Sequence, residues 1–125
     1  MKSFFKAVAV MMLLVSTGAF AANFDGSYTF SSRSKEGKPD MQNWNGTMTI
    51  KGDEMYRTYK SADGKEQKFY TSIIKQDGKI YILKHTKAYK PEYIGNEHRS
   101  KIILSGATLI LESEDGKFKE NWDKK

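Results

Sequence analysis

The sequence predicts an all-β fold, an eight-stranded antiparallel up-and-down meander barrel, on three observations. Short runs alternate apolar and polar residues, which is the period of a strand with one buried face. No window shows the 3.6-residue period of an amphipathic helix. Tight turns separate the runs, and Asp-Gly pairs, which favour type I′ hairpins, stand at Asp63-Gly64, Asp77-Gly78 and Asp115-Gly116. Eight strands in sequence close most simply into a barrel, because closure leaves no exposed sheet edge.

The expected strands follow one another with mostly short links. They span residues 24–32, 43–51, 54–61, 66–75, 79–85, 98–104, 108–113 and 117–122. Two connections are longer, a polar one over 33–42 and another over 86–97. The second carries Tyr89 and Tyr93, and such aromatic side chains either form a lid or a protein-binding edge, or fold down and close the barrel end.

Alternation assigns an inward face to six of these strands, and those faces hold large side chains. The inward residues are Phe24, Tyr28 and Phe30, then Trp44, Met48 and Ile50, then Met55, Arg57 and Tyr59, then Ser100, Ile102 and Leu104, then Leu109 and Leu111, and finally Phe118, Glu120 and Trp122. The fourth and fifth strands are apolar on both faces, so the pattern leaves their inward side open.

The first 21 residues have the pattern of a cleaved signal peptide. Lys2 and Lys6 give a positive start, residues 7–15 are an uninterrupted apolar run, and Ala19-Phe20-Ala21 provides small residues for cleavage after Ala21. The run is shorter than the ~20 residues that a membrane-spanning helix needs. We therefore expect residues 22–125 to be one exported domain, periplasmic or secreted, with no transmembrane span.

Composition limits the classes of partner. The chain has 21 basic and 15 acidic residues, but the lysines are scattered and the arginines few, unlike a nucleic-acid-binding surface. We expect no nucleic acid, and only weak contact with anionic envelope components. Cysteine is absent, so the domain must fold without disulfides.

Two segments resemble the lipocalin and fatty-acid-binding-protein group, especially its small bacterial lipocalin-like members. Residues 24–28, Phe-Asp-Gly-Ser-Tyr, are similar to the opening Phe-x-Gly-x-Trp of those barrels, with Tyr28 in place of Trp. Residues 105–111 with 115–118 resemble a late hairpin of the bacterial members. Two departures stand beside this resemblance. Fatty-acid-binding proteins insert a helix pair after the first strand, where only a short polar loop fits here, and lipocalins are longer, usually carry a terminal helix and often have disulfides. The resemblance implies a calycin-type barrel that binds a small apolar or amphipathic molecule.

Arg57 is the most informative candidate, because it lies between Met55 and Tyr59 on an inward face. A buried guanidinium needs a partner. That partner is a ligand carboxylate, as the resemblance implies, or Glu120; alternatively, the strand faces outward and Arg57 is solvated. With Arg57 as the polar anchor, the predicted ligand-binding residues are Arg57, Tyr59, Tyr28, Phe30, Trp44, Met48, Phe118 and Trp122.

Other chemistry has weaker support. His85 and His98 flank the second long loop and would approach each other across a hairpin, but a metal site needs three or four ligands. The sequence has no cysteine nucleophile, no Gly-x-Ser-x-Gly motif and no phosphate-binding glycine loop, so we expect no enzyme, metal or cofactor. The leading function is binding of a small, partly apolar ligand, anionic if Arg57 anchors it. The alternative is a protein-interaction module, an inhibitor or envelope-associated factor, with a packed interior and no ligand.

Overall fold

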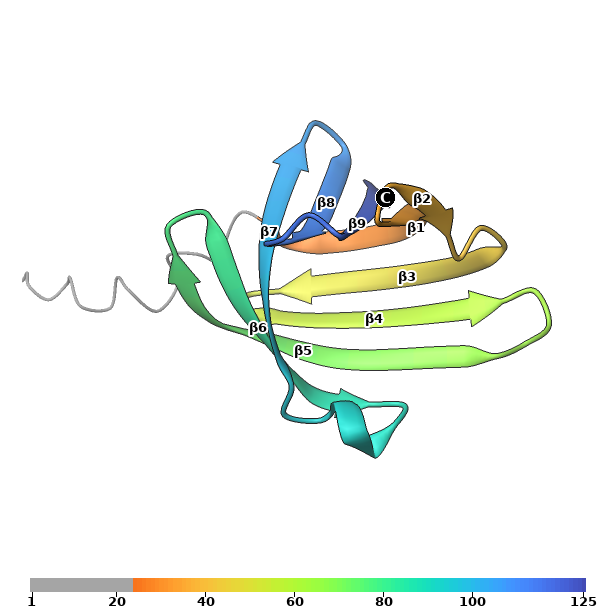
Figure 1. Ribbon diagram of the computed structural model, residues 1–125, viewed down its shortest axis with the longest axis horizontal. Coiled ribbons are helices and arrows are strands. Elements are labelled where there is room, and N and C mark those ends of the chain that lie inside the picture. Colours follow the sequence, from red (N-terminus) through yellow and green to blue (C-terminus); the bar gives the residue numbers. More distant parts are fainter. Residues whose placement is uncertain (1–23) are drawn as a thin grey trace, which may run out of the picture.

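Apart from the second and third, strands that are neighbours along the chain pair with each other in a computed structural model that describes residues 24–125 (Figure 1). The predicted signal peptide, residues 1–21, lies outside the described residues. The elements in order are β1 (Gly26–Lys35), β2 (Lys38–Asp40), β3 (Trp44–Lys51), β4 (Glu54–Ser61), β5 (Glu66–Asp77), β6 (Ile80–Ala88), the 3-10 helix η3 (Pro91–Tyr93), β7 (Glu97–Ser105), β8 (Thr108–Ser113) and β9 (Phe118–Lys124). Within this part of the chain, no helix has the length and apolar character to cross a membrane.

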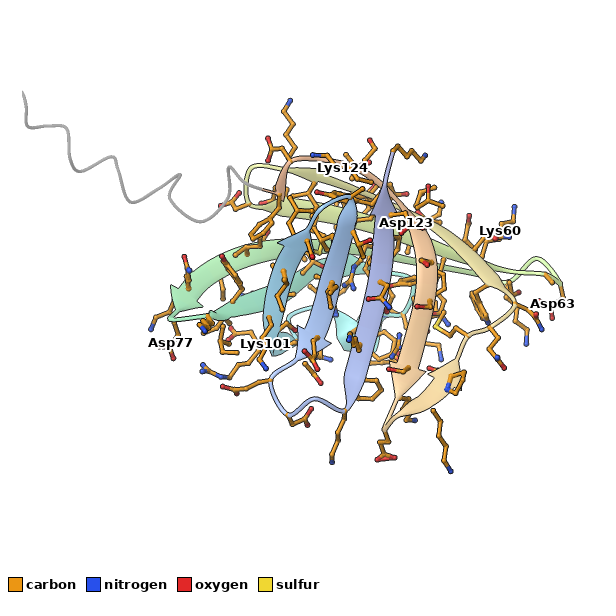
Figure 2. All side chains as sticks on the ribbon, turned by 90° about the horizontal axis from the view of Figure 1, so that it is seen from above. Lys60, Asp63, Asp77, Lys101, Asp123 and Lys124 are labelled. Carbon is orange, nitrogen blue, oxygen red and sulfur yellow. The ribbon has the colours of Figure 1, made fainter. Side chains whose placement is uncertain are left out.

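The sheet closes because β1 pairs with both β3 and β9, and all pairs are antiparallel. In Figure 1, β3, β4 and β5 lie side by side, and Figure 2 shows β7, β8, β9 and β1 side by side in the opposite wall. The three-residue strand β2 pairs only with the end of β1, so eight strands form the barrel wall of the described residues. The predicted all-β, eight-stranded, antiparallel barrel is confirmed.

The prediction of an irregular connection over residues 33–42 is wrong. Strand β1 continues to Lys35, turns at Glu36 and Gly37, and returns as β2. Both turn residues have positive φ, 51° and 81°, which is the backbone of a type I′ hairpin. The sequence lacks the usual Asn-Gly or Asp-Gly signal here, so this hairpin escaped prediction. The connection over 86–97 is shorter than expected, because β6 extends to Ala88. The short helix η3 lies within the remaining connection.

The inward faces follow the predicted alternation. In β3, Met48 and Ile50 are buried while Thr47 and Thr49 are exposed. The two strands that the pattern left open are now assigned: β5 turns Thr71 and Ile73 inward, and β6 turns Leu83 and His85 inward. The apolar residues on the other face of β5 remain in solvent, with Tyr70 42% and Ile74 46% exposed.

The hydrophobic core fills the barrel end that carries the β3–β4, β5–β6 and β7–β8 turns. Its largest fully buried side chains are Trp122, Tyr28 and Tyr59, and the apolar residues around them are Met48, Ile50, Met55, Ile73 and Leu109. Gly46 allows β3 to approach this core closely, because a Cβ there would lie 3.1 Å from Phe30 Cβ and 3.4 Å from the Trp122 ring. Charged side chains such as Lys60, Asp63 and Asp77 lie at the periphery (Figure 2).

Candidate functional site

A cavity of about 880 Å³ opens at the barrel end opposite the hydrophobic core. Successive strands of an antiparallel meander alternate in direction, so the β4–β5, β6–β7 and β8–β9 connections meet at this end with the β1–β2 hairpin. The cavity wall consists of the last parts of β1, β4, β6 and β8 and the first parts of β5, β7 and β9. The interior is therefore packed at one end and hollow at the other.

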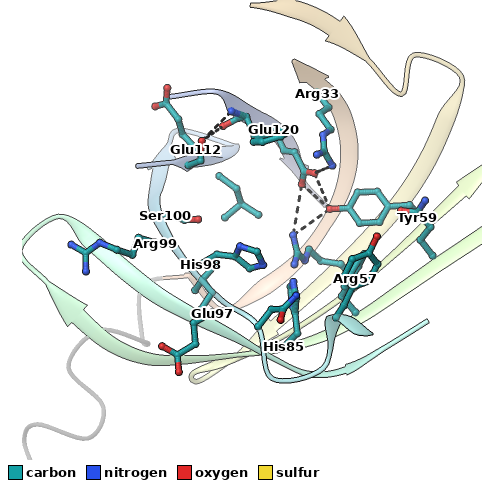
Figure 3. A pocket seen from close by; sticks show the side chains of 18 of the residues that line it. Arg33, Arg57, Tyr59, His85, Glu97, His98, Arg99, Ser100, Glu112 and Glu120 are labelled. Carbon is teal, nitrogen blue, oxygen red and sulfur yellow. Dashed lines mark hydrogen bonds and ion pairs between the residues drawn. The ribbon is translucent and has the colours of Figure 1, made fainter. Parts of the chain in front are cut away.

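Glu120 lines the cavity and accepts hydrogen bonds from three side chains, of which Figure 3 labels Tyr59 and Arg33. Tyr59 Oη donates to both carboxylate oxygens at 2.8 and 3.0 Å, and Trp122 Nε1 donates at 3.1 Å. Arg33 Nη1 forms an ion pair with Glu120 Oε2 at 3.0 Å. The Glu120 side chain is only 8% exposed, so these donors replace the water that a buried carboxylate would otherwise need.

Arg57 projects from β4 into the same space, and its side chain is only 12% exposed. Its nearest carboxylate oxygen, Glu120 Oε1, is 3.9 Å away, and its hydrogen bonds to Tyr59 Oη and Thr71 Oγ1 are both 3.3 Å long. Arg57 Nε is buried without a hydrogen-bond partner. The solvated alternative for Arg57 is therefore wrong, and the pairing with Glu120 is present but loose. The ligand-anchor role stays a prediction.

Tyr59 connects the two charges. It accepts a hydrogen bond from Arg57 and donates its proton to Glu120. Burial raises the pKa of Tyr59 far above its ordinary value, and the Glu120 carboxylate adds to this while Arg57 opposes it. Tyr59 therefore remains a protonated donor throughout the physiological pH range.

The two histidines lie close together in the cavity, as predicted, with ring centroids 4.9 Å apart. His85 is buried and its Nδ1 is 3.0 Å from Thr71 Oγ1, whereas His98 is exposed to the cavity. Burial, helped by the positive charge of Arg57 and by His98, lowers the pKa of His85 to about 4. Burial and Arg57 also lower the pKa of His98. Among residues 24–125, no group of three or more metal-ligating side chains is found.

Aromatic rings surround the mouth of the cavity. Phe69 of β5 packs edge-on against Tyr89 at 5.5 Å and lies 6.1 Å from Tyr93, so the aromatic residues of the second long connection stand over one side of the barrel. On the other side, the Arg33 guanidinium lies 5.2 Å from the centre of the Phe118 ring. Aromatic walls beside partly buried arginines suit a ligand that carries both an apolar body and a polar group.

The predicted site residues divide between the cavity lining and the hydrophobic core. Arg57, Tyr59 and Phe118 line the cavity. The other five pack into or against the core and are absent from the cavity lining, so the expected aromatic wall is corrected: they are Tyr28, Phe30, Trp44, Met48 and Trp122. Their faces were predicted correctly, but their positions along the barrel axis were not.

Sequence reasoning missed Arg33 because it placed this residue in the connection over 33–42, whereas β1 continues to Lys35 with a β-bulge that changes its alternation. The register of the β1–β9 pair shifts between Phe30 and Ser32, which brings Arg33 to the cavity although strict alternation from Phe30 would point it outward. Thr71 was missed because β5 has apolar residues on both faces. The inward position of Glu120 did indicate that a buried carboxylate needs a partner, but it did not single out Arg33.

Comparisons with family models, curated proteins and solved structures find no match for this chain. The closed antiparallel barrel, with a cavity at one end that polar side chains help to line, is compatible with a lipocalin-like fold. The candidate site is therefore interpreted from its own geometry and chemistry.

Proposed function

We propose that this protein is an exported, lipocalin-like binding protein that holds a small, partly apolar molecule in the open end of its barrel. The single observation that carries the proposal is the incomplete pairing of Arg57 at the cavity. This largely buried cation has no hydrogen-bond partner for its Nε, and its other contacts to neighbouring residues are long. Glu120 pairs more closely with Arg33, which leaves the Arg57 guanidinium available for an incoming acceptor. A carboxylate or similar anion fits a planar guanidinium best.

The cavity walls support the apolar part of the proposed ligand. Phe69, Leu83 and Leu111 line the interior, while Tyr89, Tyr93 and Phe118 stand near its mouth. A volume of about 880 Å³ is within the range of small-molecule sites. This hollow end favours ligand binding over the alternative of a packed interaction module. Export outside the cytoplasm remains part of the proposal on the pattern of residues 1–21.

A titration with two molecules of matched shape tests the proposal. In isothermal titration calorimetry, we expect the purified protein to bind 2-naphthoate more tightly than 2-naphthylmethanol, because only the former carries a carboxylate. Replacing Arg57 by Met should weaken naphthoate binding about tenfold or more, which corresponds to the loss of a charged hydrogen bond. Lys60→Met, on the outward face of the same strand, is the matched control. Equal naphthoate affinity in both variants would exclude Arg57 as the anchor.

A further inference from the structure

The two histidines belong to the same polar chain as Arg57. Arg57 Nη2 and Thr71 Oγ1 are 3.3 Å apart, and Thr71 Oγ1 is 3.0 Å from His85 Nδ1. Since a guanidinium only donates, the Thr71 hydroxyl accepts from Arg57 and its own proton is free to donate to His85 Nδ1. This arrangement suits a neutral His85 with its proton on Nε2.

His98 completes the group from the neighbouring strand. Its ring lies 4.9 Å from that of His85 and projects into the cavity beside Arg57 (Figure 3). It is exposed to the water of the cavity, so it can exchange a proton without any rearrangement of the core. Both imidazoles are neutral at pH 7, because burial and the Arg57 charge lower their pKa values.

We propose that His98 is a proton-linked second contact for the anion bound at Arg57, so that the cavity binds singly charged aromatic anions more tightly as the surroundings become acidic. The proposal rests on the proposed function and names the regulation of the same site. An anion beside Arg57 offsets the repulsion that disfavours the imidazolium, and the new charge then attracts the anion in turn. The proton comes from solvent, and only the N–H bond of the imidazolium forms.

Other charged groups from the surrounding strands also face the cavity near His98. Arg57 of β4 is the cation that acts on both histidines. Glu120 of β9 is already held by Arg33 and Tyr59. On β7 and just after β8, Glu97, Arg99 and Glu114 lie at the mouth, and Arg99 is paired with Glu114 at 2.8 Å. Tyr93 lines the loop side of the cavity. Glu112, Asp115 and Asp40 complete the acidic lining.

Naphthalene-2-sulfonate is a suitable probe, because its charge does not change between pH 5.5 and pH 8. We expect its affinity for the purified protein to rise about fivefold from pH 8 to pH 5.5, because the imidazolium that forms beside the bound anion attracts it. Calorimetry at pH 6 in two buffers of different ionisation enthalpy should show proton uptake. Neutral 2-naphthylmethanol should show neither effect.

The His98→Gln variant separates this mechanism from titration of the carboxylates at the mouth. This variant should bind naphthalene-2-sulfonate with the same affinity at pH 5.5 and pH 8. Thermal unfolding at both pH values confirms that the variant is folded. A ratio of fivefold that persists in His98→Gln would overturn the proposal in favour of the carboxylates. Binding that depends on Arg57 but not on pH would overturn it and leave the proposed function intact. Absence of sulfonate and naphthoate binding at every pH would contradict both.

Discussion

The stability of the folded chain should fall as the pH decreases from 7 to 5, because His85 is buried in its neutral form. Its side chain belongs to a residue only 7% exposed, and its pKa in the fold is about 4 against an ordinary value of 6.5. Between these two values the unfolded chain binds a proton that the folded chain does not, so acid favours the unfolded state. Each pKa unit corresponds to about 1.4 kcal/mol, which gives a total near 3 kcal/mol and about 2 kcal/mol between pH 7 and pH 5.

Urea unfolding followed by tryptophan fluorescence measures this loss, and Trp122 in the core is a suitable reporter. The interval from pH 7 to pH 5 lies above the range in which most carboxylates titrate, so the histidines dominate it. The His85→Gln variant should keep only the part of the slope that comes from His98, whose pKa is lowered in the same direction. A free energy of unfolding that is constant over the interval, or a variant with the full parental slope, would refute the reasoning.

Two further changes test the packing and charge of the interior. Glu120→Gln should lower the free energy of unfolding by about 3 kcal/mol in urea titrations, because it leaves two cations near a neutral amide; a loss below about 1 kcal/mol would show that Arg33 and Arg57 do not depend on this carboxylate. Gly46→Ala should cost about 2 kcal/mol by thermal or urea unfolding, since its Cβ would press on the Thr58 carbonyl. An equally stable Gly46→Ala variant would mean that β3 can move away freely.

The fold was predictable because turn chemistry and alternation agree along most of the chain. The Asp77-Gly78 pair, for example, marks the place of the β5–β6 turn, where Gly78 has a φ of 63°. Asp77 itself is the last residue of β5 and lacks the positive φ that a type I′ turn at this pair would require. The inward placement of Met48 in β3 and of Glu120 in β9 likewise follows from the period of two. Such local patterns predict the structure correctly because each depends only on residues within one hairpin.

The position of Arg33 could not be predicted from local sequence patterns. Its approach to Glu120 depends on a bulge in the β1–β9 pair, which is a contact between the two ends of the described chain. One extra residue in a strand reverses the faces of all residues after it. Nothing in the local sequence Ser31-Ser32-Arg33 marks that insertion, so the closer cationic partner of Glu120 was visible only in the closed barrel.

The division between core and cavity has a different physical origin, the tilt of the strands. Tyr28 lies opposite Met48 in the ladder, and Met48 lies opposite Arg57. Tyr28 and Met48 are at most 1% exposed, whereas Arg57 lines the cavity. In a closed barrel the strands are inclined by roughly 35–45° to the axis, so residues in one row of the ladder rise from the packed end to the open end as the row crosses successive strands. Alternation therefore predicts which side chains face inward, but the register at which β9 meets β1 decides which of them pack the core and which are left to meet a ligand.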